Sequence, residues 1–266
     1  MQDLYKMRND EMSKSFNKIA KQYDKLRLSY PLELYEEIFS FCGKIKTALE
    51  IGIGTGKATK KFLESGIDVT AIEPSFEMLN IACEKYNSFQ NFHPLIMSFE
   101  EFFSENSHQK FDLVFAASSF QWIKRDDRLN MISSLIKPKG FFVRFKTTTI
   151  LQNSSVKEKI LYDLYEKFFP VFLPKEVAHT SFNEGDYIAA DFDQIMKKKF
   201  FRLVSFKRDE YIAFINTYTE YLCLPKKLRD DFEYAVKTSV SMEDQFNLTQ
   251  KCALIMARKN MTAIDN

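Results

Sequence analysis

The sequence has no run of about 20 apolar residues, the length that a membrane-spanning helix needs. Its first six residues already include Asp3 and Lys6, and no apolar stretch follows them, so we expect no secretory signal peptide. Together these absences predict a cytoplasmic protein that does not bind membranes. The glycosylation sequons at Asn153 and Asn247 are then expected to be chance occurrences.

Cysteine and histidine are scarce, and neither is clustered. The four cysteines lie far apart without the C-x-x-C spacing of metal and redox sites, and the three histidines are equally scattered. We therefore predict no metal site, and we expect the cysteines to be buried, reduced thiols. The residues are Cys42, Cys83, Cys223 and Cys252, with His93, His108 and His179.

The sequence also has no large excess of positive or negative charge. The 38 Lys and Arg residues against 36 Asp and Glu residues give a net charge of +2, whereas nucleic-acid-binding domains usually carry a basic stripe. No nucleic-acid partner is favoured, and the run Lys197 to Lys199 is expected to be a solvated face. A hydrophobic content of 45%, with 27 Phe and 12 Tyr, is ample for a sizeable folded core.

Glycine is rare as well: the chain has seven glycines in 266 residues, where roughly 7% is typical. Three of the seven are Gly52, Gly54 and Gly56. Glycine alone adopts positive φ, or lies close against a ligand, at little steric cost. The cluster therefore predicts a tight loop at a ligand site.

From residue 46 to residue 146, short apolar stretches alternate with amphipathic ones. Strands alternating with helices of about 10 residues are typical of βαβ units with right-handed crossovers, so we predict an α/β, doubly wound, mostly parallel sheet. The expected strands are 46–51, 68–72, 92–97, 111–116 and 141–146; the expected helices are 57–65, 75–86 and 125–136, with a turn at 137–140.

The flanking regions are predicted to be mainly helical. Before the alternating region, Ser13 is expected to cap one helix, and Pro31 and Gly43 to delimit a second. After residue 150 the chain is rich in Phe and Tyr. Helices are expected within 155–192, with breaks at Pro170 and Pro174, and at 209–222 and 226–239, with strands at 200–206 and 252–257.

The glycine cluster lies between a predicted strand and a predicted helix, an arrangement typical of nucleotide sites. A dinucleotide-binding loop follows G-x-G-x-x-G, whereas this chain has Lys57 where the last glycine belongs. Glu50 precedes the loop by two residues; its carboxylate repels a pyrophosphate but suits a ligand with an ammonium group, such as S-adenosylmethionine. Glu73, at the end of the next strand, suits a ribose diol, although NAD would use it equally.

These segments resemble class I S-adenosylmethionine-dependent methyltransferases. Phe16 to Pro31, with Tyr23 and Arg27, is similar to the lead-in of a small-molecule subgroup that includes trans-aconitate and malonyl-carrier-protein methyltransferases. The resemblance implies a Rossmann-like methyltransferase fold, with a seven-stranded sheet, an antiparallel last strand and a helical lid. The matching segments are Leu49 to Gly56, Ala71 to Ser75 with Met78 and Leu79, Ser98 to Phe102, Phe111 to Phe115, Phe120 to Trp122 and Leu135 to Gly140.

The resemblance also implies three parts. Residues 1–150 would hold N-terminal cap helices and the cofactor-binding core, and residues 151–199 a helical lid or acceptor-binding insertion. Residues 200–266 would supply last strands and helices completing the same sheet. The chain departs from the family pattern at Lys139, where Gly is commoner, at Gln121, where many relatives have His, and in the adenine segment, which lacks the usual Asp.

Carried over by position, the resemblance assigns a cofactor role to fourteen residues. Glu50 and the glycines would hold the methionine end and Glu73 the ribose. Further residues would lie at the adenine (Pro74, Met78, Ser98, Phe99, Glu100), beside the methyl donor (Ala116, Ala117) and over the cofactor carboxylate (Tyr23, Arg27).

The implied reaction is an in-line methyl transfer to a small-molecule acceptor, with a carboxylate or hydroxyl oxygen favoured, in a monomer or homodimer. An ionised carboxylate needs no general base; the candidate acid–base groups are His179 and Tyr187. Two alternatives remain: a non-catalytic S-adenosylmethionine-binding or partner subunit, and a nicotinamide-dependent oxidoreductase, which Glu50 and Lys57 disfavour.

Overall fold

The computed structural model describes residues 19–123, 125–151, 155–169 and 183–261, which belong to two compact units. What we call the sheet unit comprises Leu28–Lys146, Thr180–Phe200 and Cys252–Asn266. The helical unit comprises Met1–Arg27, Thr147–His179 and Phe201–Lys251. Each unit has its own hydrophobic core, so each is described by itself.

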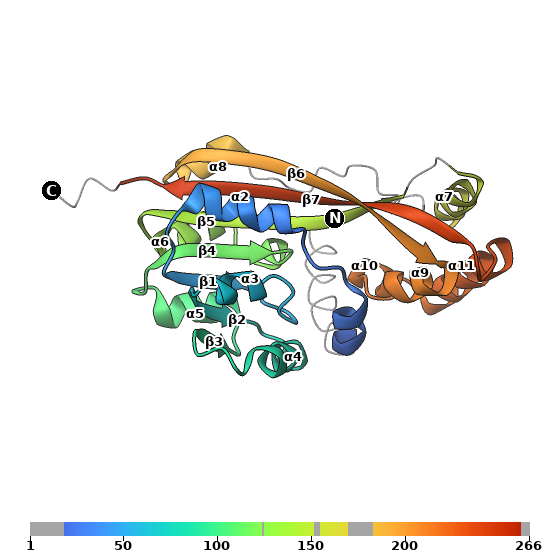
Figure 1. Ribbon diagram of the computed structural model, residues 1–266, viewed down its shortest axis with the longest axis horizontal. Helices are drawn as coiled ribbons and strands as arrows, with labels where there is room; N and C mark the ends of the chain where they lie inside the picture. The colour runs from blue at the N-terminus through green and yellow to red at the C-terminus, as the bar shows by residue number, and fades with distance from the viewer. Residues whose placement is uncertain (1–18, 124, 152–154, 170–182, 262–266) are drawn as a thin grey trace. The chain divides into compact units, whose positions relative to one another are not determined.

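A helix over residues 19–26 opens the described chain, and the labelled elements follow it (Figure 1). They are α2 (Leu32–Cys42), β1 (Thr47–Ile51), α3 (Lys60–Glu64), β2 (Asp68–Ile72), α4 (Phe76–Tyr86), β3 (Phe92–Leu95), α5 (Phe99–Asn106), β4 (Phe111–Ala117), the 3-10 turn η1 (Phe120–Trp122), α6 (Arg128–Ser134), β5 (Ile136–Leu151), α7 (Val156–Phe168), α8 (Glu184–Ala189), β6 (Phe192–Lys207), α9 (Arg208–Ile215), α10 (Thr219–Leu222), α11 (Lys226–Ser239) and β7 (Gln245–Lys259).

The seven strands form one sheet in the order β3-β2-β1-β4-β5-β7-β6. β1 pairs in parallel with β2 and β4, and β5 in parallel with β4, whereas β7 runs in the opposite direction (Figure 1). The predicted doubly wound, mostly parallel sheet with an antiparallel last strand is confirmed. The order reverses between β1 and β4, and ligands of such sheets bind outside the carboxyl ends of the strands at that point.

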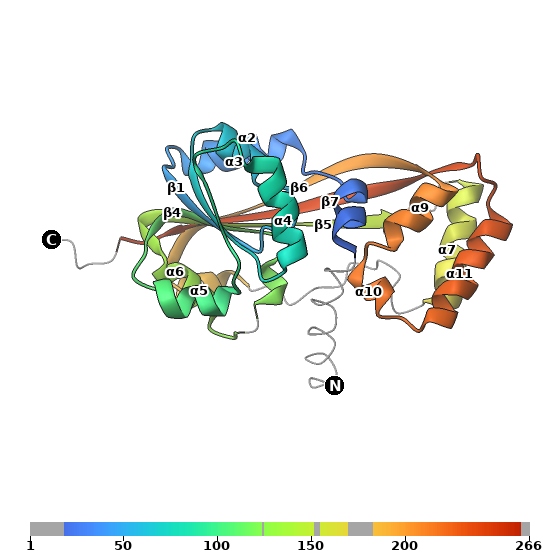
Figure 2. The same cartoon turned by 90° about the horizontal axis from the view of Figure 1, so that it is seen from below.

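Helices cover both faces of the sheet unit (Figure 2). One core packs α2, α3 and α4 against the sheet; in it Phe62, fully buried, stacks on Phe115 with ring centroids 4.2 Å apart. The other core packs α5, α6 and α8 against the opposite face, around Val114, Phe142 and Tyr187. Burial on both faces explains why the central strands read as continuous apolar runs.

Helix ends follow local chemistry that the sequence already contains. Gly43 ends α2 with a φ of 64°, and Ser75 caps α4 by accepting a hydrogen bond from the Met78 amide at 3.2 Å. Helix α5 was not predicted, although it begins with a capping box between Ser98 and Glu101. The S-x-x-E spacing was the available signal for this helix.

The last three strands are longer than predicted: β5 and β6 have 16 residues each and β7 has 15. The expected turn at 137–140 lies inside β5, where Lys139 takes a φ of 64° and the pairing with β4 shifts register. The predicted helical region 155–192 contains α7 and α8 but ends where β6 begins at Phe192. Apolar runs mark only the doubly buried part of these strands, since their remaining residues alternate or are exposed.

The core of the helical unit is a cluster of aromatic rings contributed by α7, α9, α11 and the adjoining strand segments. Phe232 is fully buried at its centre, 4.8 Å from Phe169 and 5.1 Å from Tyr165 between ring centroids. Aromatic pairs at these spacings add about 0.5–1.5 kcal/mol beyond their area burial. The Phe and Tyr content after residue 150 thus builds a separate core.

Candidate active site at the glycine loop

The three clustered glycines form the loop between β1 and α3, and all have positive φ: 70° at Gly52, 57° at Gly54 and 78° at Gly56. A Cβ on Gly52 would lie 2.6 Å from the Ser119 side chain, and one on Gly56 would lie 2.5 Å from the Tyr86 ring. A Cβ on Gly54 would meet no described atom within 4 Å. Gly52 and Gly56 are therefore required for packing, whereas Gly54 faces open space.

The loop is fastened to the end of β2. The Gly52 amide donates to the Ile72 carbonyl at 2.9 Å, and the Gly54 amide donates to Oε2 of Glu73 at 2.9 Å. The other carboxylate oxygen of Glu73 accepts from the Ser75 amide at 3.0 Å. Burial raises the pKa of Glu73, and these two backbone hydrogen bonds oppose the rise. Each oxygen retains a second lone pair, which leaves the carboxylate able to accept a further donor.

Glu50, at the end of β1, is fully buried. Its Oε2 accepts a hydrogen bond from Thr59 Oγ1 at 2.7 Å, while Oε1 has no hydrogen-bond partner among the described residues. Burial raises the pKa of this carboxyl to about 8; the Thr59 hydrogen bond opposes the rise and the negative charge of Glu73 adds to it. A buried acceptor left without a donor is costly, so this oxygen is suited to a cationic or hydrogen-bonding ligand.

Strand register brings the ends of β1, β2 and β4 to one edge of the sheet. Glu50 lies opposite Ala71 on β2 and opposite Phe115 on β4. Ala116 and Ala117, the last two residues of β4, therefore lie level with the start of the glycine loop. The predicted residues at the methionine end, the ribose and the methyl donor thus share this edge.

The residues predicted at the adenine are held in two helix starts. Met78 is buried in α4, and Pro74 is exposed just before that helix. Ser98 is occupied by the capping box, in which its amide donates to Glu101 Oε2 at 2.7 Å, while Phe99 is buried in the core beneath α5. Their contact with adenine, and that of Glu100 in the first turn of α5, stays a prediction.

Tyr23 and Arg27, predicted to lie over the cofactor carboxylate, belong to the helical unit. The Arg27 guanidinium lies 3.7 Å from the centroid of the Tyr218 ring and 5.2 Å from that of Tyr23, and it donates to the Thr217 carbonyl at 3.0 Å. These contacts give Arg27 a fixed place in its own unit. Its cofactor role stays a prediction.

Of the two candidate acid–base groups, His179 lies outside the described residues. Tyr187 lies on α8 with its ring fully buried and stacked near Phe142. Burial raises the pKa of its hydroxyl to about 12, and the positive charge of Arg144 opposes that rise. The hydroxyl therefore keeps its proton at neutral pH and is suited to donate a hydrogen bond rather than to act as a base.

Sequence reasoning missed three residues at this edge. Ser119 donates through Oγ to the Ile51 carbonyl, and Ser118, with a φ of 59°, shares a 3.0 Å hydrogen bond with the Tyr30 hydroxyl. Arg144 lies opposite Ala116 on β5. The two serines directly follow the predicted fourth strand, which was a usable signal, and Arg144 stands as a charge among four apolar residues.

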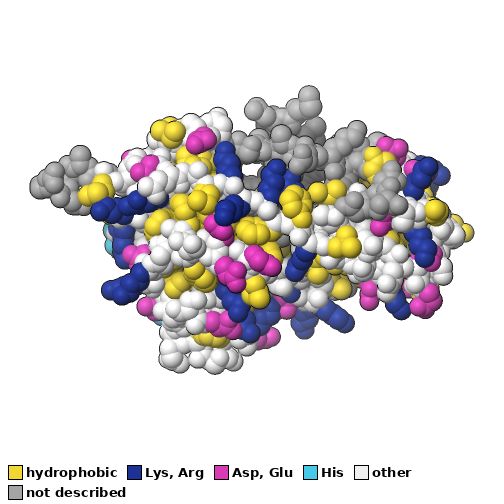
Figure 3. Space-filling view, turned by 45° about the horizontal axis from the view of Figure 1, so that its top comes forward, with side chains coloured by type: hydrophobic (Ala, Val, Ile, Leu, Met, Phe, Trp, Pro, Cys, Tyr) yellow, Lys and Arg dark blue, Asp and Glu magenta, His cyan; other side chains and the backbone are white. Residues whose placement is uncertain are grey.

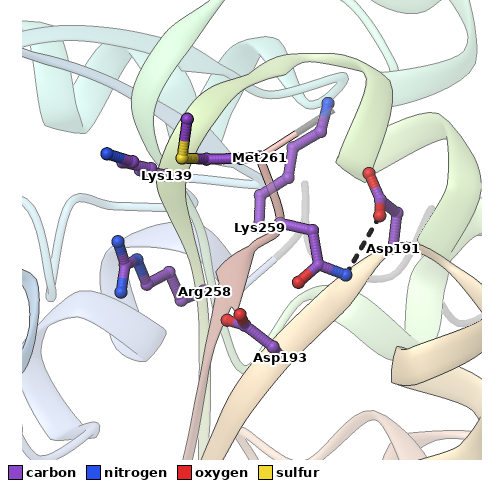
Figure 4. A pocket seen from close by; sticks show the side chains of 7 residues that line it. Lys139, Asp191, Asp193, Arg258, Lys259 and Met261 are labelled. Carbon is purple, nitrogen blue, oxygen red and sulfur yellow. Dashed lines mark hydrogen bonds between the residues drawn. The ribbon is translucent and has the colours of Figure 1, made fainter. Parts of the chain in front are cut away.

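A separate polar pocket of about 510 Å³ lies at the opposite edge of the sheet unit (Figure 4). It is placed there by the start of β5 and the end of antiparallel β7. Within it Asn260 donates to Asp191 at 3.1 Å, and the lining includes three basic and two acidic side chains. No charge of one sign dominates, so we assign it no ligand; its lining residues are Lys139, Asp191, Asp193, Arg258, Lys259, Asn260 and Met261.

Comparison with known proteins shows which part of the chain is similar to methyltransferases. Residues 49–142 match the family model described as a methyltransferase domain. The chain is 32% identical over 135 residues to the Saccharomyces cerevisiae protein named "Probable S-adenosylmethionine-dependent methyltransferase CRG1", covering 49% of this chain and 45% of that protein. It is 30% identical over 147 residues to malonyl-[acyl-carrier protein] O-methyltransferase 2 of Ilyobacter polytropus, covering 50% and 52%. The chain thus spans about half the length of these curated relatives.

Solved structures share the fold at low sequence identity. An Anaeromyxobacter dehalogenans protein, proposed to be a type II methyltransferase, aligns with a TM-score of 0.62 and 16% identity, covering 89% of this chain and 99% of the other. Phosphoethanolamine N-methyltransferase 2 of Haemonchus contortus, solved with S-adenosylhomocysteine, aligns with a TM-score of 0.50 and 16% identity, covering 95% and 60%. These likenesses show the fold alone.

Proposed function

We propose that this chain, whose residues 49–142 form a methyltransferase domain of the class I fold, transfers a methyl group from S-adenosylmethionine to a small-molecule acceptor. The observation that carries the proposal is the buried Glu50, whose Oε1 has no hydrogen-bond partner among the described residues. This oxygen lies at the end of β1, where the sheet opens into the glycine loop.

The residues present fit the cofactor at two points. An ammonium group would supply the donor that Oε1 of Glu50 lacks, and its positive charge would favour the ionised carboxylate. The open space beside Gly54 lets a ligand lie directly against the backbone. A side chain at this position would obstruct that approach. A dinucleotide pyrophosphate would instead place negative charge near a carboxylate, which costs free energy.

When bound, the cofactor supplies an activated methyl group on a sulfonium, with a neutral thioether as the leaving group. The chain has to bind the cofactor and the acceptor, orient them toward each other and exclude water from between them. Glu50 and Glu73 would fix the two polar ends of the cofactor, and the glycine loop would let it approach the backbone. Ala116 and Ala117 offer small side chains at the edge where the acceptor would have to approach.

An oxygen acceptor, carboxylate or hydroxyl, is the favoured substrate class. The name of one relative, malonyl-[acyl-carrier protein] O-methyltransferase, supports methyl transfer to oxygen. Tyr187, the candidate acid–base group that the structure describes, keeps its proton at neutral pH, which favours an acceptor that is already ionised. A carboxylate meets that condition.

The partners that we propose are small molecules. On the face drawn in Figure 3, basic and acidic side chains are intermingled and form no basic stripe among the described residues, which favours a small acceptor over a nucleic acid. No helix in the described part of the chain has the length and apolar character needed to cross a membrane.

The test compares the binding of S-adenosylhomocysteine with that of NAD to the full chain. Thermal shift and calorimetry measure the binding of each ligand. We expect the first ligand to bind and the second to leave the melting temperature unchanged. Glu50→Gln removes the carboxylate, and a lost charge-assisted hydrogen bond of about 1.5–3 kcal/mol predicts at least about tenfold weaker binding. Glu64→Gln, at an exposed glutamate on α3, is the control and should bind normally. Stabilisation by NAD alone would overturn the proposal.

A further inference from the structure

Arg144 is an unusual residue for the middle of the sheet unit. It follows Phe142 and Val143 on β5, is largely buried, and lies opposite Ala116 at the end of β4. Residues opposite one another in parallel strands project from the same face, so Arg144 shares a face with Ala116, which lies in the core of α5, α6 and α8. Its position is next to the edge where the methyl donor is proposed to bind.

The surroundings of Arg144 supply aromatic contacts and positive charge. Its guanidinium lies 4.6 Å from the centroid of the Phe120 ring and 5.6 Å from that of Tyr187. The guanidinium of Arg128, from α6, lies 4.7 Å from the same Phe120 ring. Two cations therefore share one ring, and the positive charge of Arg144 adds to the effect of burial in lowering the pKa of Arg128.

No acidic side chain balances Arg144 among the described residues. Burial lowers the pKa of its guanidinium, and the one neighbour that opposes this effect is Tyr187, not an Asp or a Glu. Asp126 favours the charged form of Arg128, but it has no such effect on Arg144. A buried cation ordinarily has an anionic partner, since an unpaired buried charge is strongly destabilising.

Two hydrogen-bond donors at this place remain able to bind a ligand. The Nε of Arg144 is buried with no hydrogen-bond partner in the described part of the chain, and the buried Tyr187 hydroxyl interacts with the Arg144 guanidinium through its oxygen, which leaves its O–H free to donate. The tyrosine hydroxyl keeps its proton, so both groups present hydrogen atoms. An oxyanion with two or more acceptor oxygens would satisfy both, and guanidinium groups bind carboxylate and phosphate with matching geometry.

We propose that Arg144, with the hydroxyl of Tyr187 and the added positive charge of Arg128, binds an anionic group of the acceptor, a carboxylate or a phosphate, beside the end of β4. This inference rests on the proposed methyltransferase function and deepens it by naming the chemical class of the acceptor. Arg144 acts here as a binding residue that positions the acceptor. The Phe120 ring holds the two guanidiniums in place for this purpose.

The test titrates two simple anions, malonate and inorganic phosphate, against the full chain saturated with S-adenosylhomocysteine, with sodium chloride of equal ionic strength as the baseline. We expect at least one anion to raise the melting temperature saturably beyond the chloride baseline. A response to malonate alone identifies a carboxylate site, and a response to phosphate alone a phosphate site. No response to either anion, while S-adenosylhomocysteine still binds, would overturn this inference and leave the proposed function standing.

The residue itself is tested with Arg144→Met, which keeps much of the side-chain length without the charge. We expect anion binding at least about tenfold weaker, from the loss of a charge-assisted hydrogen bond, and S-adenosylhomocysteine affinity within about twofold of wild type. If Arg144→Met does not fold, Arg144→Lys is tested in its place, because lysine keeps the positive charge but lacks the planar guanidinium that can bind two oxygens at once. Arg125→Gln, at an exposed arginine paired with Asp127, is the matched control. Unchanged anion binding in the folded Arg144 variants would contradict the assignment.

Discussion

The two carboxylates of the site are held in different ways. Both oxygens of Glu73 accept backbone amides, from Gly54 and Ser75, whereas Glu50 has one oxygen on Thr59 and one without a described partner. Burial raises the pKa of both groups. Glu73 therefore stabilises the loop even without ligand, whereas under the proposed function Oε1 of Glu50 gains its missing partner when a cationic group binds.

Glu50→Gln is expected to stabilise the ligand-free protein at neutral and alkaline pH. The pKa of Glu50 is about 8 in the folded chain and about 4.3 in an unfolded one, so its contribution to stability is full below about pH 4 and is lost as the pH rises through 8. The melting temperature of Glu50→Gln should therefore exceed that of wild type by a margin that grows from about pH 5 to pH 8 and then levels off. Parallel melting curves across this range would contradict the raised pKa; Glu64→Gln serves as the reference.

Gly54→Ala is expected to weaken S-adenosylhomocysteine binding by at least about tenfold, since the added methyl group would occupy the space beside the loop. The change also forces alanine into a φ of 57°, which costs roughly 1 kcal/mol of stability. Gly66→Ala provides a matched control, because Gly66 has a φ of 75° and equally open surroundings but follows α3, away from the loop. Both variants should lose similar stability in thermal melts. Equal affinities in the two variants would show that the space at Gly54 is not used.

Within secondary structure, the sequence predicted most closely the elements that have a regular apolar pattern along their whole length. β2 and α11 were predicted with their observed bounds, since an apolar β-branched run and a long amphipathic period leave little choice. β5, β6 and β7 were predicted too short because their outer residues alternate, and α5 was missed because its eight residues have few apolar positions. The differences between predicted and observed bounds are explained by the length and exposure of these elements, and not by the intrinsic helix or strand propensity of their residues.

Ser98→Ala is expected to destabilise the protein by about 1 kcal/mol, because it removes the N-terminal cap of α5. For a chain of this length that corresponds to a fall in melting temperature of about 2–4 °C. Ser104→Ala, at an exposed position inside the same helix, should be neutral or slightly stabilising. A melting temperature unchanged by Ser98→Ala would show that the capping box contributes nothing.

Across the chain as a whole, the cofactor site could be predicted from the sequence because its residues lie close together in short segments. Glu50, the three glycines and Glu73 fall within 24 residues, at the ends of two adjacent strands. The proposed acceptor site was not readable, since Phe120, Arg128, Arg144 and Tyr187 come from η1, α6, β5 and α8 and meet only through packing. Sequence spacing gave no signal that these four side chains share one place.

The most direct test of the account is the number of protons released when S-adenosylhomocysteine binds, measured by calorimetry in buffers of different ionisation enthalpy. If the ammonium group reaches Glu50, binding at pH 7 should release close to one proton, because a group with a pKa of about 8 is then mostly protonated before binding and ionised after it. The release should fall toward zero above about pH 9 and be absent in Glu50→Gln. Binding at pH 7 without proton release, or with the same release in Glu50→Gln, would contradict the central role given to this carboxyl.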